Sequence, residues 1–343
     1  MLPLGADDPR VIGEFRLHTR LGAGGMGRVY LASSPGGRAV AVKVIHAHLA
    51  RDAEFVDRFR REVAAAQAVN GGYAAPVVAA GPDDDPPWLA TAYVAGPSLQ
   101  EAVMETGPLP EDAVLKLAAG LAEALNAIHA VGLVHRDLKP DNVLLAGDGP
   151  RVIDFGIARA LDGTGATAAG SVVGTPSFMS PEQAQGQMAG PASDVFSLGG
   201  VVYFAATGTA PFGSGNPAVL LYRIVHTEPD LELIPARLRD LVAACLAKDP
   251  AGRVPTRPRR GPRWPHRPAR PGRADVPWRE QAEAGRFRRR ASRPRRQTSR
   301  PRRPASPPRR GAARPRGRAA ADRPDRRSAR RPGRPGARPP WAS

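Results

Sequence analysis

The most restrictive feature of this 343-residue sequence is a change in composition near Arg253. The 90 residues that follow contain 30 Arg, no Lys and 5 acidic residues, and none of them is Leu, Ile, Met or Tyr. Such a segment cannot bury enough apolar surface to offset the entropy of ordering it, so we predict that residues 254–343 are disordered. A folded core must therefore come from residues 1–253, which carry 20 Lys+Arg and 27 Asp+Glu.

The first hundred residues predict a small lobe of strands with one helix. Apolar residues alternate with polar ones along several runs, which we predict to be strands at 15–21, 28–32, 39–45, 77–78 and 88–94. Residues 52–69 have apolar side chains at helical spacing with charges between them, which predicts a helix. Strands followed by one helix are typical of a small α+β lobe, and Ala95-Gly96-Pro97 would connect it to the rest of the chain.

The remainder of the folded part predicts a larger, mainly helical lobe. Helical spacing of apolar residues recurs at 111–131, 193–207, 218–226 and 235–246. Residues 195–212 are uncharged and about as long as a membrane span, but glycines and a proline interrupt them, so we expect a buried helix there. The single cysteine, Cys245, can form no internal disulfide; we expect a small core residue and a reducing, cytoplasmic location. Residues 1–10 lack the pattern of a secretion signal.

Two short strings concentrate charged and metal-binding residues. The first, Val134-His135-Arg136-Asp137-Leu138-Lys139-Pro140-Asp141-Asn142, is followed twelve residues later by Asp154-Phe155-Gly156. A surface loop would explain any one of these polar residues alone. Phosphoryl transfer requires such a set together, because it depends on positioned carboxylates, cations and metal-binding oxygens rather than on a nucleophilic side chain.

Two further features lie in the predicted small lobe. Residues 22–29 form a G-x-G-x-x-G-x-V string that leads into a strand, so its glycine backbone could lie close to phosphates; a flexible turn without a ligand is the alternative. Lys43 is a lone cation in the apolar run 39–45, and a buried ammonium needs an acidic partner. Glu62 on the predicted helix is the candidate, unless the charges around it simply face solvent.

Together these strings resemble those of the bacterial eukaryotic-like (Hanks-type) serine/threonine protein kinases. Further matches are Gly174-Thr175-Pro176, Ser180-Pro181-Glu182 and the run 193–199. The resemblance implies a two-lobed α+β protein kinase fold that transfers the γ-phosphoryl group of ATP, with Mg²⁺ (or Mn²⁺), to Ser or Thr hydroxyls of proteins. The implied domains are an N-terminal tail at 1–12, a kinase domain at 13–253 with lobes at about 13–94 and 98–253, and the tail at 254–343.

The resemblance assigns roles in catalysis to six residues. Asp137 would accept the proton of the substrate hydroxyl, and Lys139 would steady the transferred phosphoryl group. Lys43, held by Glu62, would bind the α- and β-phosphates. The implied metal ligands are Asn142 and Asp154.

Other positions carry binding and structural roles by the same resemblance. Asp194 would begin the central buried helix, and Arg253 would pair with Glu182. A hinge alanine, Ala92, stands where relatives often carry glutamate, but hinge bonds come from the backbone, so we expect ATP binding to survive. The residues implied to surround ATP are Leu21, Gly22, Gly24, Gly27, Val29, Ala41, Lys43, Tyr93, Val94 and Leu144.

Arg136, beside Asp137, implies a phosphorylation switch. The activation segment of such kinases corresponds here to the residues from Asp154 to Glu182. In relatives with arginine at this position, a phosphorylated residue of that segment pairs with the arginine and orders the segment. We expect autophosphorylation at Thr167, with Thr164 as the second choice. Lys139, together with Thr175, favours Ser or Thr over Tyr as the acceptor.

The Arg-rich tail has two interpretations. A basic disordered arm is typical of proteins that bind nucleic acid or anionic membranes. However, the composition changes within a motif, and Arg, Pro, Ala and Gly have codons that are G or C at the first two positions, as a GC-rich gene read out of frame would give. We therefore favour a frameshift near codon 253, which would remove the last helix that similar kinases have. Resequencing the locus decides between the two.

Two other classes of function remain open on sequence alone. A pseudokinase or signalling scaffold would bind nucleotide or partners without turnover, although the presence of the whole catalytic set weakens it. A nucleic-acid-binding protein would depend only on the tail. The expected partners are protein substrates and a second copy of the chain in a back-to-back or activation dimer, with no membrane segment.

Overall fold

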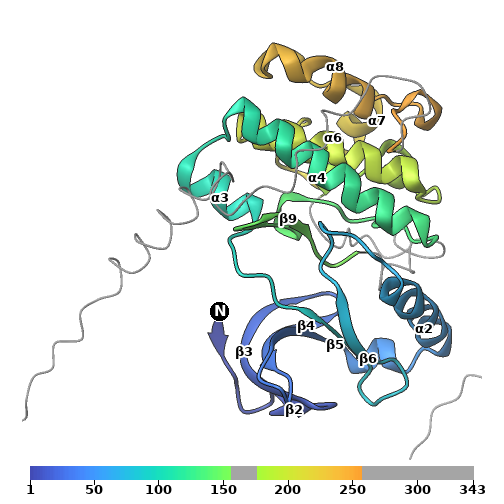
Figure 1. Ribbon diagram of the computed structural model, residues 1–343. Coiled ribbons are helices and arrows are strands. Elements are labelled where there is room, and N and C mark those ends of the chain that lie inside the picture. Colours follow the sequence, from blue (N-terminus) through green and yellow to red (C-terminus); the bar gives the residue numbers. More distant parts are fainter. Residues whose placement is uncertain (156–175, 257–343) are drawn as a thin grey trace, which may run out of the picture. The chain divides into compact units, whose positions relative to one another are not determined.

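The computed structural model describes residues 1–155 and 176–256, and within them a sheet-rich lobe and a helical lobe (Figure 1). The sheet has the order β1-β3-β4-β5-β7-β6, and β2 also pairs with β3. Its strands are β1 (Leu2–Pro3), β2 (Val11–Ile12), β3 (Phe15–Gly24), β4 (Gly27–Ser33), β5 (Ala39–Ile45), β6 (Val77–Gly81) and β7 (Trp88–Ala92). All of its pairings are antiparallel, and the strands predicted at 15–21, 28–32 and 39–45 correspond to β3, β4 and β5.

The alternation of side chains along the strands explains which face of the sheet is buried. In β5, Val40 and Val42 are buried while their neighbours are at least partly exposed, so one face of the strand meets the core. Phe15 and Tyr30 from β3 and β4 join this core, and the ring of Trp88 meets that of Phe15 edge to face at 5.6 Å. The sheet therefore has its own apolar cluster, which fixes the strands that border the nucleotide-sized cleft described below.

Two helices belong to the sheet-rich lobe: α1 (Ala47–Ala50) and α2 (Ala53–Gln67). The Asp52 side chain caps α2 by accepting hydrogen bonds from the backbone N–H groups of Glu54 and Phe55. The apolar stripe of α2, led by Phe55 and Phe59, is buried. This arrangement confirms the predicted helix at 52–69 and turns its charged residues toward the remaining faces.

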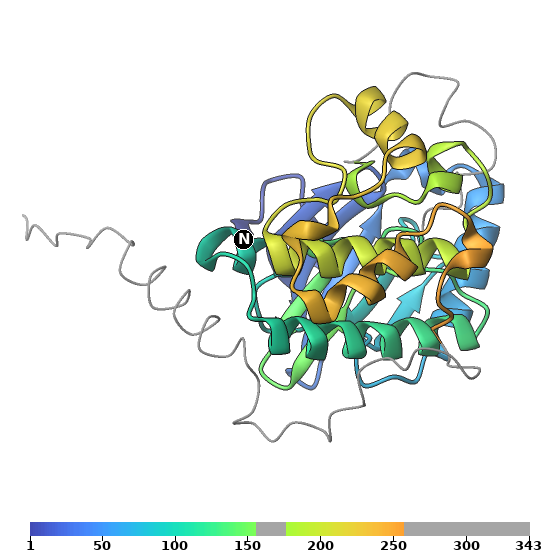
Figure 2. The ribbon, with the colours of Figure 1, turned by 90° about the horizontal axis from the view of Figure 1, so that it is seen from above.

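The second lobe is mainly helical, as the sequence predicts. Its elements are α3 (Leu99–Thr106), α4 (Glu111–Ala130), β8 (Val143–Ala146), β9 (Gly149–Val152), α5 (Pro181–Ala184), α6 (Pro191–Thr207), α7 (Pro217–His226) and α8 (Ala236–Cys245). Short 3₁₀ turns occur at Pro140–Asn142, Pro176–Phe178, Leu231–Leu233 and Pro250–Gly252. Figure 2 shows α4 and α6 lying alongside each other through this lobe.

Helix α6 is apolar on all sides because it is buried on all sides. Of its 17 residues, those from Ser193 to Ala205 are buried, which is what a helix without a polar face requires. Gly208 ends it in the left-handed conformation, with φ of 76°. Residues 195–207 of the uncharged run thus belong to the buried central helix that we predicted. Among the described residues only α4 is long and apolar enough to cross a membrane, and 56% of its most apolar window is buried in the protein.

Among the described residues, the sequence prediction missed seven short helices and strands: α1, α3, α5, β1, β2, β8 and β9. Helix α3 begins with a capping box in which Ser98 and Glu101 bond each other's backbone N–H groups, a signal that the Ser-x-x-Glu spacing carries. Strands β1 and β2 have only two residues each and no periodicity to reveal them. They form because β3 offers an unpaired edge.

Candidate active site

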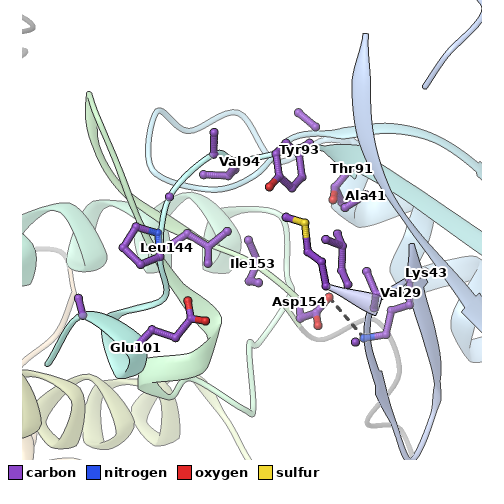
Figure 3. A pocket seen from close by; sticks show the side chains of 18 of the residues that line it. Val29, Ala41, Lys43, Thr91, Tyr93, Val94, Glu101, Leu144, Ile153 and Asp154 are labelled. Atoms are coloured by element: carbon purple, nitrogen blue, oxygen red, sulfur yellow. Dashed lines mark ion pairs between the residues drawn. The ribbon is translucent and has the colours of Figure 1, made fainter. Parts of the chain in front are cut away.

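A cleft of about 590 Å³ lies between the sheet and the residues around α3 and β8 (Figure 3). Among the residues implied to surround ATP, those that line the cleft are Leu21, Gly22, Val29, Ala41, Lys43, Tyr93, Val94 and Leu144. Gly24 and Gly27 do not line it. Lining residues that the sequence prediction did not include are, among others, Leu89 and Thr91 on β7, Glu101 and Glu105 on α3, Ile153 and Met1.

The glycines of the loop between β3 and β4 serve different purposes. A Cβ on Gly27 would lie 2.1 Å from the carbonyl oxygen of Val44, so only glycine allows β4 to approach β5 there. A Cβ on Gly24 would meet nothing within 4 Å, which leaves that part of the loop open to a ligand. The Nε2–H of His46 donates to the Gly24 carbonyl at 3.0 Å, and the His46 backbone N–H donates to that of Met26. The loop is therefore held from its β5 side.

Residues 134–142, the catalytic loop, are attached to α6 by the buried carboxylate of Asp194. Its two oxygens accept the backbone N–H groups of His135 and Arg136, each at 2.8 Å, and the ring Nε2 of His129 lies 2.7 Å from one of them. A carboxylate that accepts this many bonds in a buried position fixes the backbone around it. Arg136 has a φ of 63°, a strained conformation that these bonds maintain.

His135 is a neutral link within the same loop. Its Nε2–H donates to the Ile153 carbonyl at 3.1 Å, and its Nδ1 accepts the Asp137 backbone N–H at 3.3 Å, which sets the tautomer. Burial lowers the pKa of this imidazole, although Asp194 opposes the shift. The ring therefore joins the catalytic loop to the segment that carries Asp154 without adding a charge.

Asp137, Lys139 and Asn142 form one compact group. The Lys139 ammonium lies 3.1 Å from the Asp137 carboxylate, and the Asn142 amide donates to the Asp137 carbonyl at 2.8 Å. The Asn142 carbonyl in turn accepts the backbone N–H of Ile153 at 3.0 Å. One side of the group is thus the catalytic loop, and the other is the turn that ends in Asp154.

Asp154 points into the cleft from a left-handed backbone conformation, with φ of 56° (Figure 3). Its carboxylate is 40% exposed and lies 3.4 Å from the Lys43 ammonium. The described residues contain no group of three or more His, Cys, Asp and Glu side chains that could hold a metal ion. Asn142 and Asp154 offer an amide oxygen and a carboxylate, the hard donors that suit a divalent cation bound partly by phosphates. The residues present therefore fit a magnesium ion that arrives with a nucleotide.

The predicted ion pair between Lys43 and Glu62 is not formed in this structure. Lys43 pairs with Asp154, whereas Glu62 lies 3.1 Å from the guanidinium of Arg136. The prediction assumed that Lys43 needs Glu62 because it is buried, yet the Lys43 side chain is 21% exposed and Asp154 compensates its charge. Lys43 and Asp154 line the cleft, whereas Glu62 does not and contacts Arg136 in place of its expected partner.

The surroundings of Glu62 do not fully satisfy its carboxyl group. Burial raises the pKa of its carboxyl above the ordinary value, and the nearby charge of Arg136 only partly offsets that effect. Its second oxygen, Oε2, is buried and has no hydrogen-bond partner within the described residues. A buried unsatisfied carboxylate oxygen costs free energy, so this arrangement favours a second partner for Glu62.

The structural pair predicted between Glu182 and Arg253 is present. The guanidinium donates to both carboxylate oxygens at 2.7 and 2.8 Å, and the Ser193 hydroxyl donates to the same carboxylate at 2.6 Å. The guanidinium also donates to the Ala247 and Ala192 carbonyls. Burial works to raise the pKa of Glu182, but hydrogen bonds from Arg253 and Ser193 outweigh it and lower the pKa.

Several predicted features lie outside the described residues. These are the phosphorylation candidates Thr164 and Thr167, the acceptor-type residue Thr175, Gly156 of the metal-binding string, and nearly all of the Arg-rich tail. Cys245, in contrast, is described and is buried, as a core residue should be. Burial raises the pKa of its thiol to about 12.

Comparison with known proteins places this site in a family. The protein kinase domain family matches residues 15–259, well over half of the sequence. The chain belongs to this family. It is 56% identical over 248 residues to a protein of Thermomonospora curvata named a probable serine/threonine-protein kinase PkwA, a match that covers 72% of this chain and 33% of that protein. It is 55% identical to the serine/threonine-protein kinase AfsK of Streptomyces coelicolor, over 72% of this chain and 31% of that protein.

The structure is also similar to the solved structure of a kinase domain. The kinase domain of Mycobacterium tuberculosis PknI, in a crystal structure of a point mutant, aligns with a TM-score of 0.58 and 28% identity. The alignment covers 73% of this chain and 94% of that one. The two-lobed kinase fold predicted from the sequence is thereby confirmed. The chain spans about a third of the length of the curated relatives named above, so the shared part is the kinase domain.

Proposed function

We propose that this protein is a serine/threonine protein kinase that transfers the γ-phosphoryl group of ATP to protein hydroxyls. The observation that carries the proposal is the convergence of Asp137, Lys139, Asn142 and Asp154 beside a cleft of about 590 Å³ that Lys43 enters from the opposite lobe. Relatives at 55–56% identity carry names with the same activity. A pseudokinase finds no support in the site, because each residue that the chemistry requires is present.

Each side chain has a task in that reaction. The Asp137 carboxylate accepts the proton of the attacking hydroxyl, and the Lys139 ammonium, 3.1 Å from it, faces the charge that develops on the phosphoryl oxygens. Lys43 binds the α- and β-phosphates, and Asn142 and Asp154 would hold the metal ion. A bound Mg²⁺ supplies positive charge to the phosphate oxygens. The protein provides the fixed geometry.

Phosphate incorporation tests the proposal directly. Full-length protein incubated with γ-labelled ATP and Mg²⁺ should become labelled on Ser or Thr, and phosphopeptide mapping should find Thr167, or Thr164 as the second site. Label found only on other hydroxyls would refute the site assignment while keeping the activity. An absence of label from protein that binds nucleotide would favour the scaffold alternative.

The pairing of Arg136 suggests how phosphorylation would change the site. We propose that a phosphorylated activation-segment residue attracts Arg136 and so releases Glu62, which then pairs with Lys43. The unsatisfied Oε2 of Glu62 and its raised pKa both support such an exchange.

We also propose that the protein forms a dimer in a back-to-back or activation arrangement. Its proposed location is the cytoplasm.

Glu62→Gln should lower the activity and should also change how the stability of the protein depends on pH. We expect phosphoryl transfer to fall about 10²-fold, because Lys43 loses the partner that positions it. Burial raises the pKa of Glu62, so the folded protein binds this proton more tightly than the unfolded chain does. The wild type should therefore lose stability relative to Glu62→Gln as pH rises from about 4 through that raised pKa.

Thermal unfolding of both proteins across this pH range measures the effect. Glu54→Gln is the matched control on the same helix, because Glu54 is 79% exposed and forms an ion pair with its helix neighbour Arg58. Glu54→Gln should leave activity and the pH dependence unchanged. A stability difference between wild type and Glu62→Gln that grows in favour of the wild type with rising pH would contradict the account.

A further inference from the structure

The N-terminal segment holds a buried carboxylate that the kinase chemistry does not use. The Asp8 side chain is completely buried, although its neighbour Asp7 is exposed. Asp8 accepts two hydrogen bonds from the Arg20 guanidinium at 2.6 and 2.7 Å, one from the Tyr30 hydroxyl at 2.8 Å and one from the Gly5 backbone N–H at 2.8 Å. A weaker bond comes from Arg28 at 3.3 Å.

These partners are placed on either side of the glycine loop. Arg20 on β3 pairs with Tyr30 on β4 at the base of the loop, whereas Arg28, which directly follows Gly27, lies opposite Ala23 nearer the tip. A single buried carboxylate that bonds both Arg20 and Tyr30 fixes the spacing of the two strands where the loop leaves the sheet. Without it, two cations would face each other across a partly buried site.

The same segment continues to the cleft. Strand β1 pairs with β3 so that Leu2 lies opposite Arg20, and the Thr19 hydroxyl donates to the Leu2 carbonyl. Beyond β1, Met1 lines the cleft together with Leu21 and Gly22, and Figure 1 shows this end of the chain beside β3. The segment thus forms part of the cleft wall as well as the support of the loop.

We propose that Asp8 and strand β1 with Met1 form a nucleotide-positioning element, in which Asp8 clamps both strands of the glycine loop and Met1 borders the cleft. The inference rests on the proposed function only in taking ATP as the ligand. Because the clamp acts at the base of the loop, away from Asp137, its loss should weaken nucleotide binding with little change in the rate of transfer from saturated enzyme. Asp8 is a positioning residue and touches no substrate atom.

Nucleotide affinity of the full-length protein tests this. The variants are Asp8→Asn and Arg28→Gln, with Asp7→Asn as the matched control, and the probe is a fluorescent ATP analogue with Mg²⁺, at a temperature where each variant is folded. We expect Asp8→Asn to raise the Kd for the probe and the KM for ATP about tenfold, while kcat changes by less than about twofold. Arg28→Gln should shift Kd in the same direction, and Asp7→Asn should match the wild type.

A purely structural clamp predicts a different result. Loss of folded protein lowers apparent kcat and leaves Kd and KM unchanged, so unchanged Kd and KM in folded Asp8→Asn would overturn the proposal. If Asp8→Asn does not fold, Arg28→Gln and Tyr30→Phe decide on the same criterion. A wild-type protein that binds the probe but transfers no phosphoryl group would refute the proposed function, and the comparison of Kd values would still test the clamp.

Discussion

Arg253→Met should destabilise the protein by about 3–5 kcal/mol, because it leaves the Glu182 carboxylate buried without its counter-charge. The Arg253 side chain is 1% exposed and Glu182 is 8% exposed, so water cannot replace the lost guanidinium. For a domain of this size, the melting temperature should fall by about 10 °C or more. The melting temperature of Arg253→Lys should lie between those of the wild type and Arg253→Met, because lysine keeps the charge but loses the two-pronged contact.

The control for this prediction is an exposed ion pair in the same lobe. Arg237 is 66% exposed and contacts Glu111 and Asp112 at 3.1 and 3.2 Å, so Arg237→Met should cost less than about 1 kcal/mol. Thermal unfolding measured side by side compares the two. A melting temperature of Arg253→Met within about 2 °C of the wild type would contradict a structural role for the pair.

The pair also predicts how the protein responds to acid. The pKa of Glu182 is lowered in the folded state, so its contribution to stability is present above the ordinary carboxyl pKa and is lost as pH falls through the lowered one. Arg253→Met should therefore differ least from the wild type at the acid end of the range. Arg253 is also the point at which the composition changes, so the last residue of ordinary composition is one that the fold requires.

Asp137→Asn should lower kcat by about 10²–10⁴-fold, because the amide cannot accept the proton of the attacking hydroxyl. The substitution keeps the size and shape of the side chain, and the backbone of the loop is held by Asp194 and Asn142. Nucleotide affinity should therefore match that of the wild type. Both quantities are measured on one preparation, by steady-state transfer and by nucleotide titration.

An aspartate outside the site provides the comparison. Asp148 is 63% exposed and pairs with Arg151 between β8 and β9, so Asp148→Asn should keep full activity. Activity of Asp137→Asn close to that of Asp148→Asn would remove Asp137 from the mechanism. Equal losses of affinity and rate would instead indicate a misfolded loop.

Patterns of residues close together in the sequence predicted most of the fold and of the site correctly. The helix at 52–69, the central helix and the catalytic loop all depend on residues close together in sequence, and their spacing reveals them. The pairing of Glu62 could not be read in this way. Lys43 pairs with Asp154 and Glu62 with Arg136, and these choices depend on how elements that are far apart in the sequence pack together.

The clamp at Asp8 was hidden for a related reason. Asp7 and Asp8 are adjacent and chemically the same, and the side chains that bond Asp8 lie 12 to 22 residues away. Short strands such as β1 likewise have no periodicity, because two residues cannot show one. Contacts that join distant residues around a single polar group leave no local signal.

The central claim is that the group around Asp137 transfers phosphate to protein hydroxyls. Its most direct test measures ADP formed and phosphate bound to Ser and Thr in one reaction of the full-length protein with ATP and Mg²⁺. The account predicts equal molar amounts of the two products, and loss of both in Asp137→Asn. ADP formed without protein-bound phosphate, or neither product from a protein that binds ATP, would contradict it.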